Sequence, residues 1–109
     1  LNSGIFLRGA PKGHRGFEVQ IYSPPEAVYP TGSIYGQTRA DIPDDHEGRW
    51  TLLRVRLVNG RVTTWVDGRR VAEGAVPEGV PVAGRVGLQI HLENASIEFR
   101  ELRIREIKR

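Results

Sequence analysis

Residues 50–73 read WTLLRVRLVNGRVTTWVDGRRVAE. Apolar and polar residues alternate through three short runs, as they do in half-buried strands: residues 50–58, 61–66 and 70–73. The pairs Asn59-Gly60 and Asp67-Gly68 separate these runs. Such pairs tolerate positive φ at both central positions, which a type I′ turn requires. The stretch therefore predicts a three-stranded antiparallel meander.

The rest of the chain shows the same period of two and contains no amphipathic helical pattern. Further strands are expected at residues 2–8, 17–22, 31–36, 85–93 and 96–107. In the last of these the apolar phase slips near Arg100-Glu101, which predicts a β-bulge. Many short antiparallel strands within 109 residues predict one all-β domain, a sandwich or jelly roll spanning residues 1–109.

Composition narrows the classes of partner. The net charge of +3 is carried mainly by arginine, but the basic run at residues 100–109 is interleaved with Glu101 and Glu106. Mixed charge on a strand favours a solvated face over a nucleic-acid groove. No apolar run is long enough for a transmembrane helix, and there is no leader of the secretory type. Cysteine is absent, which leaves the compartment open. We expect neither nucleic acid nor membrane as a partner.

Two predicted strands carry unusual polar faces. In residues 17–22, Glu18 and Gln20 alternate with apolar residues, and Gln89 and His91 do the same in the later strand. If both strands lie in one sheet, a carboxylate, two carboxamides and an imidazole share one surface. Such a surface suits a polar, neutral ligand.

Seven motifs resemble one family in its order along the chain: NSGIFLR (2–8), FEVQI (17–21), TGSIYG (31–36), GRWT (48–51), WVDG (65–68), GRVGLQIH (84–91) and FRELRI (99–104). The family is the 3-keto-disaccharide hydrolase, or 3-keto-glucoside hydrolase/lyase, domain. The resemblance implies a concanavalin-A-like antiparallel β-sandwich, a jelly roll related to laminin-G domains. It also implies a secreted or periplasmic protein.

The chain departs from the family pattern in three places. Tyr22-Ser23 stands where the family has an aspartate after the Glu-x-Gln strand, and Thr51 and Glu101 each replace an asparagine. The resemblance begins partway through the family domain and covers its C-terminal portion. We therefore expect an incomplete sandwich with an exposed sheet edge, and a homo-oligomer formed through such edges.

The resemblance implies cleavage of a 3-keto-glycoside by elimination followed by hydration. A ketone at C3 acidifies the C2 proton, so Glu18 or His91 would remove it as catalytic base. The expected substrate-binding residues are Arg8, Gln20, Tyr35, Gln89 and Arg100. Arg8 or the two amides would stabilise the enolate oxygen. This chemistry needs no redox cofactor in the domain. The three histidines lack metal-ligand spacing, so no metal site is predicted, and a divalent ion is left open.

Each residue also has a structural interpretation. Glu18 can pair across strands with Arg8 or Arg100, His91 can be a surface residue, and Tyr35 can be a packing residue. Trp50 is expected in the core, whereas the place of Trp65 is open. The alternatives to an enzyme are a non-catalytic carbohydrate-binding or protein-interaction module on the same fold, and a fragment without activity.

Overall fold

The computed structural model describes residues 2–9, 16–24, 26–43, 46–81, 83–89 and 97–107. These residues form six strands: β1 (Asn2–Gly9), β2 (Phe17–Tyr22), β3 (Leu53–Val58), β4 (Arg61–Val66), β5 (Arg69–Ala75) and β6 (Arg85–Leu88). The described part of the chain has no helix, and so none that could cross a membrane. The expected all-β fold is confirmed.

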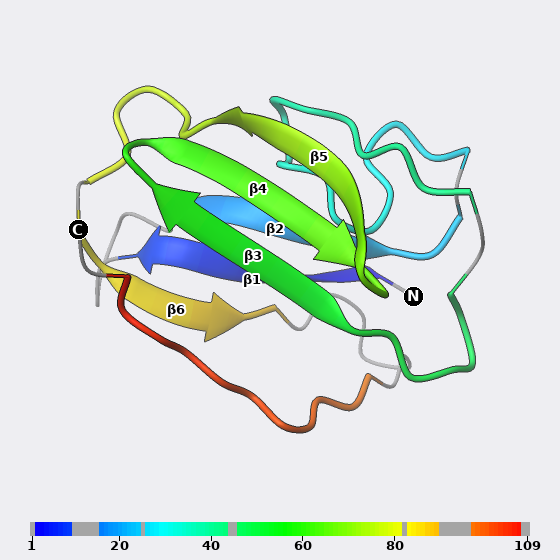
Figure 1. The fold of residues 1–109 in the computed structure, drawn as a ribbon. Coiled ribbons are helices and arrows are strands. Elements are labelled where there is room, and N and C mark those ends of the chain that lie inside the picture. The colour runs from blue at the N-terminus through cyan, green and yellow to red at the C-terminus, as the bar shows by residue number, and fades with distance from the viewer. Residues whose placement is uncertain are drawn as a thin grey trace.

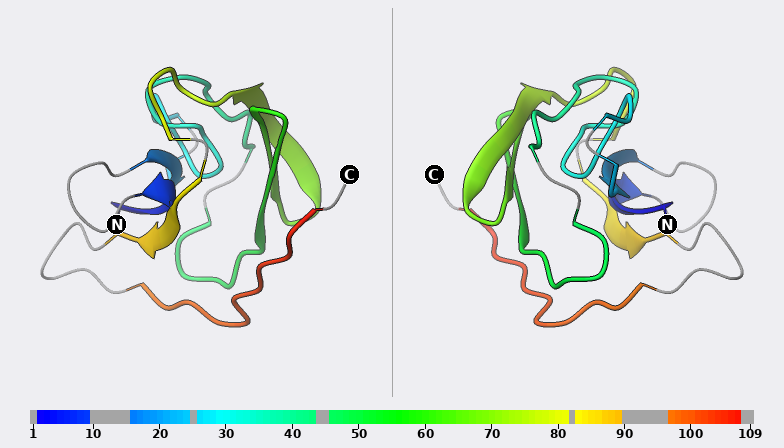
Figure 2. Two further views of the ribbon diagram at one scale, coloured as in Figure 1. Left: turned by 90° about the vertical axis from the view of Figure 1, so that its left-hand side faces the viewer. Right: turned by 90° about the vertical axis from the view of Figure 1, so that its right-hand side faces the viewer.

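The strands form two antiparallel sheets that face each other as a sandwich (Figure 1). One sheet has the order β2-β1-β6 and the other the order β3-β4-β5. Figure 2 views the molecule from the two sides and shows the sheets as separate layers. The strand at residues 17–22 and the start of the predicted strand at 85–93 therefore lie in one sheet, with β1 between them.

The predicted meander is confirmed, because β3, β4 and β5 pair in sequence. Asn59 and Gly60 have φ of 53° and 73°, and Asp67 and Gly68 have φ of 50° and 83°. These values lie in the left-handed region that the turn chemistry anticipates. The second turn is also held by the Asp67 carboxylate, which accepts a hydrogen bond of 2.9 Å from the backbone N–H of Leu52.

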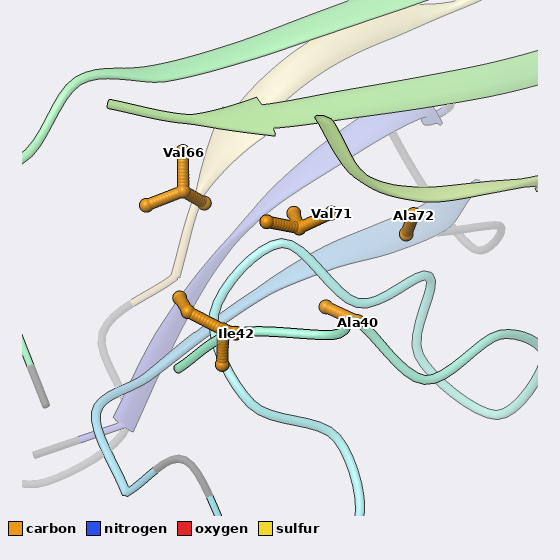
Figure 3. Packing of buried hydrophobic residues seen from close by; sticks show 5 residues of the cluster. All are labelled: Ala40, Ile42, Val66, Val71 and Ala72. Carbon is orange, nitrogen blue, oxygen red and sulfur yellow. The ribbon is translucent and has the colours of Figure 1, made fainter. Parts of the chain in front are cut away.

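Alternation along the strands builds the core between the sheets. Phe17 and Val19 of β2 pack with Ile34 and with Val62 of β4, and all four are buried. A second buried cluster lies beside β5 and consists of Ala40, Ile42, Val66, Val71 and Ala72. Figure 3 shows the strand residues of this cluster pointing toward Ala40 and Ile42 on the segment that crosses beneath them. The loop before β3 is thus anchored in the core.

This loop covers one side of the sandwich. The backbone of residues 31–35 follows the outer edge of β2, where the Tyr35 N–H donates to the Glu18 carbonyl at 2.9 Å. The strand predicted at residues 31–36 is nevertheless wrong, because only isolated bridges form at Ile34. The reason is local: Gly32 and Gly36 have positive φ, and Ile34 closes a turn onto Thr38. At the edge of β5, the Asp41 N–H donates to the Val71 carbonyl at 2.8 Å.

The opposite side of the sandwich is open. No described strand pairs with the outer edge of β3 or of β6. The core-facing residues of β3 are only partly buried (Leu53, Val55 and Leu57), whereas their neighbours on β4 are buried (Val62, Thr64 and Val66). Residues 97–107, orange to red in Figure 2, cross this side of the molecule.

Three expectations about this side need correction. Residues 97–107 form no strand, so the predicted last strand is wrong there. The predicted phase slip coincides with a φ of 52° at Glu101, but this segment pairs with no described strand and therefore contains no β-bulge. The strand expected at 85–93 ends at Leu88, and its residues 90–93 lie outside the described part. Trp50 is 48% exposed rather than in the core, because it precedes β3 and lies under the Arg100 guanidinium.

Candidate functional site

The candidate site lies on the outer face of the β2-β1-β6 sheet. Gly4 of β1 is paired with Gln20 of β2, and its carbonyl accepts a hydrogen bond of 2.9 Å from the Gln89 N–H. Paired residues of neighbouring strands point to the same face of a sheet. The register therefore places positions 4, 20 and 89 in one row across the sheet, with glycine in the middle.

The Glu18 side chain fills the space that this glycine leaves. A Cβ atom built on Gly4 would lie within contact distance of Glu18 Oε2, and within 2.8 Å of its Cδ. Glu18 itself is only partly buried. The carboxylate thus rests on the backbone of β1 with one side toward the surface of the sheet.

Gln20 holds this carboxylate. Its side chain is 6% exposed, and its amide group lies between two acceptors, Glu18 Oε2 at 3.1 Å and the Ser3 carbonyl at 3.3 Å, so the amide nitrogen is assigned to that position. A buried carboxamide that donates to a carboxylate fixes its position. Such a carboxylate can accept a proton from a bound substrate.

Gln89 closes the row on the other side of Gly4. Its carbonyl accepts a hydrogen bond of 2.7 Å from the hydroxyl of the buried Ser3. Its side-chain Oε1 is buried and has no hydrogen-bond partner in the part of the chain that the structure describes. An unpaired buried acceptor is costly, and because this oxygen is buried, a ligand could reach it only if the side chain turned outward.

A surface hollow of about 490 Å³ adjoins Gln20. Its wall consists of residues from β1, β2 and the loop that follows β2: Asn2, Gln20, Tyr22, Pro24, Glu26, Ala27, Val28, Tyr29 and Tyr35. This volume is within the range of small-molecule sites, about 300–1,000 Å³. Glu18 is next to the hollow through its contact with Gln20 and through the hydrogen bond from the Tyr35 N–H.

Three tyrosines distinguish the hollow. The ring centroids of Tyr29 and Tyr35 are 5.3 Å apart, with planes inclined by 37°, and Tyr22 stands at the end of β2. Tyr35 is one of the residues predicted to bind substrate, whereas Tyr22 and Tyr29 are not. The alternation of β2 puts Tyr22 on the face of Gln20 and could have identified it. Tyr29 lies in a loop, and no periodicity in the sequence predicts that this loop brings Tyr29 to the sheet.

The two arginines among the predicted residues lie elsewhere. Arg8 comes directly after the last β1 residue that pairs with β2, at the opposite end of the strand from Asn2. Its guanidinium donates to the Pro81 carbonyl at 3.5 Å. The Arg100 guanidinium is 3.9 Å from the centroid of the Trp50 ring, close to the start of the other sheet. Neither lines the hollow. His91 lies outside the described residues.

Within the described ranges, no group of three or more histidine, aspartate or glutamate side chains is arranged to hold a metal ion. His46 is engaged in a structural contact instead. Its Nδ1 lies 2.7 Å from Arg49 Nη2 and 3.8 Å from the Asp67 carboxylate. Because arginine can only donate, Nδ1 must be the acceptor, and this contact connects the loop before β3 to the turn between β4 and β5.

The comparison with known families covers nearly the whole chain. The sequence profile of the 3-keto-alpha-glucoside-1,2-lyase-like domain matches residues 1–105. No significant match was found among curated proteins or among solved structures. The family match suggests a carbohydrate-related activity for the domain. The chain belongs to the family of 3-keto-alpha-glucoside-1,2-lyase-like domains.

Proposed function

We propose that the domain cleaves 3-keto-glycosides by elimination, with Glu18 as the base. The observation that carries this proposal is the Glu18 carboxylate, which lies over Gly4 and is held by Gln20, a residue in the wall of a hollow of sugar-binding size. The family match over residues 1–105 supports the substrate class.

In the proposed reaction Glu18 takes the C2 proton, which the neighbouring C3 ketone has made acidic. The electron pair of the C2–H bond forms the enolate, with the charge on the C3 oxygen. Collapse of the enolate forms the C1–C2 double bond and expels the aglycone from C1 with the bonding electrons. The aglycone takes up a proton, and water then adds across the enone to give the free 3-keto sugar. His91 is the other base to be tested.

The polar row across the sheet supplies the partners for this substrate. Gln20 keeps the Glu18 carboxylate in place, and Gln89 would accept from a sugar hydroxyl once its buried side-chain oxygen turned outward. Tyr35, at the edge of β2, lines the hollow beside this row, where the part of the substrate beyond the sugar ring would lie. The C3 oxidation that creates the substrate belongs to a separate redox reaction, because elimination itself leaves the overall oxidation state of the sugar unchanged.

The experiment uses a 3-keto-α-glucoside with a chromogenic leaving group. Glu18→Gln should lower release by about 10²-fold or more, the usual range for losing one acid or base group. Glu26→Gln is the matched control, because Glu26 also lines the hollow but lies exposed on the loop. His91→Ala, measured in parallel, tells whether the base is Glu18 or His91. The unoxidised glucoside should stay intact, since its C2 proton is not acidic. Equal loss in Glu18→Gln and Glu26→Gln would reject Glu18 as the base.

A carbohydrate-binding module without catalysis is the second candidate. It is favoured by Tyr22-Ser23, which stands where the family has an aspartate, and by an open hollow rich in tyrosine. This function predicts sugar affinity with no release of the chromophore. Glu18→Gln would then change the binding free energy by about 1–3 kcal/mol, the cost of one hydrogen bond to a charged group.

A further inference from the structure

The hollow beside Gln20 has two chemically different parts. Asn2 and Gln20, both on strands of the sheet, supply amide groups on one part of its wall. Pro24, Ala27 and Val28, on the loop after β2, supply apolar surface on the other, beside the exposed carboxylate of Glu26. Val28 is 72% exposed, so a large aliphatic group faces the solvent at the apolar part. A ligand that fills the hollow would therefore have one polar and one apolar portion.

Two aromatic rings stand on the wall of the hollow. Tyr35 is 48% exposed although its ring packs against Tyr29, so one part of its surface remains open to a ligand. The inclination of 37° between the rings leaves an angled aromatic wall rather than a closed stack. Aromatic faces bind other flat rings in offset or edge-to-face contact.

The backbone holds this aromatic wall in place. The Tyr35 N–H donates to the Glu18 carbonyl at 2.9 Å, and the Thr31 N–H donates to the Tyr22 carbonyl at 3.0 Å. The Ala27 carbonyl accepts from the Arg39 guanidinium at 3.3 Å, which ties the loop to the next segment. A preformed wall loses little conformational entropy when a ligand binds, so its contacts contribute more fully to affinity.

We propose that the tyrosine side of this hollow is the subsite for the leaving group and that it takes a flat, aromatic aglycone. The inference rests on the proposed function, because it assumes that the sugar lies over Glu18 and Gln20. With C2 of the sugar at the carboxylate, the substituent on the adjacent C1 extends from the row of amides. Tyr29, Tyr35 and Val28 line the same hollow as Gln20 and offer aromatic and aliphatic surface there. An aromatic group would cover the exposed parts of Tyr35 and Val28.

The test compares two unoxidised ligands, phenyl α-glucoside and methyl α-glucoside, by isothermal titration calorimetry. Because neither is turned over, the dissociation constants report binding alone. Phenyl α-glucoside should bind about 2- to 12-fold more tightly, the factor that one aromatic contact provides. Tyr35→Ala should abolish this preference and leave the affinity for methyl α-glucoside within about 2-fold.

Two further variants separate the aromatic ring from structural effects. Tyr35→Phe keeps the ring and should keep the preference for the phenyl ligand. Tyr35→Leu keeps side-chain bulk without aromaticity, and serves in place of Tyr35→Ala if that variant fails to fold by circular dichroism. Trp65→Ala is the control on the opposite sheet and should leave both affinities unchanged.

The outcomes keep the two proposals apart. A preference for the phenyl ligand without turnover of the 3-keto-glucoside would reject elimination and retain the aromatic subsite. Turnover without a preference that depends on Tyr35 would reject the subsite and retain elimination. Equal affinity for both ligands, or no measurable binding of either, would overturn the subsite.

Discussion

A side chain at position 4 would occupy the space that the Glu18 carboxylate fills. Gly4 has an ordinary extended backbone, so alanine fits its φ and the obstacle is the Glu18 side chain, from the carboxylate back to Cγ at 2.9 Å. Because the far end of Glu18 can move, Gly4→Ala should change the free energy of unfolding by less than about 1 kcal/mol. The displaced carboxylate, however, would lose its contact with Gln20. We expect Gly4→Ala to lower turnover or sugar affinity at least about tenfold, since misplacement by about 1 Å is enough to do so.

Gly87→Ala is the matched control for this prediction. Gly87 lies on β6 of the same sheet, and among the described residues a Cβ there would meet only the Cβ of Phe6 at 3.8 Å, an ordinary contact. Activity and urea unfolding should both stay near those of the unchanged protein. If Gly4→Ala keeps full activity with a folded structure, then Glu18 is not held where the reaction needs it.

At the scale of single elements, the two turns of the meander allow a paired measurement. Asn59 and Asp67 both have left-handed φ, at 53° and 50°. Alanine at either position should cost about 1–2 kcal/mol, the strain of a Cβ in that region. Asp67→Ala should cost about 1 kcal/mol more, because the carboxylate also accepts the Leu52 N–H at 2.9 Å and lies 3.4 Å from the Arg49 guanidinium. Urea unfolding of both variants measures the difference, and equal costs would mean that the Asp67 contacts contribute nothing to stability.

The same two turns explain why this element could be predicted from the sequence. Asn59-Gly60 and Asp67-Gly68 act locally, and the alternation of β3, β4 and β5 fixes which face is buried. Residues 97–107 alternate nearly as well but form no strand. A period of two indicates that a segment can pair, not that it aligns with a neighbouring strand. The strand that was wrongly expected at 31–36 failed through its two positive-φ glycines.

The candidate site, like the fold, was predictable from the sequence only in part. The adjacency of Glu18 and Gln20 follows from alternation within one strand, and was predictable. The role of Gly4 depends on the register between β1 and β2, and the position of Tyr29 depends on a loop that returns to the sheet. Strand register and the path of a loop depend on residues far apart in the sequence. The row of amides could be anticipated from alternation within the strands, whereas the hollow could not. Arg8 was assigned by residue type, and its guanidinium bonds to Pro81 instead.

At the scale of the whole molecule, the sandwich is closed on one side and open on the other. Residues 31–35 cover the edge of β2, whereas β3 and β6 have no further partner among the described strands. Large apolar side chains are exposed before β3, on β6 and on the segment that crosses this side: Leu52, Val86, Leu88, Leu102 and Ile104. Unpaired strand edges that carry apolar side chains bind other strands.

We therefore expect the chain to self-associate through this open side, so that light scattering gives a mass well above 12.2 kDa at high concentration. Leu52→Lys and Ile104→Lys, at positions 68% and 84% exposed, should shift the mass toward the monomer because each places a charge on the contact surface. Val28→Lys is the control, since Val28 is 72% exposed but lies by the hollow beside β2. Arg54 and Arg56 are exposed on β3, so pairing of two β3 edges brings like charges together and association should strengthen as salt screens them. A mass of one chain at all concentrations, with and without salt, would show that the sandwich is stable with both edges free.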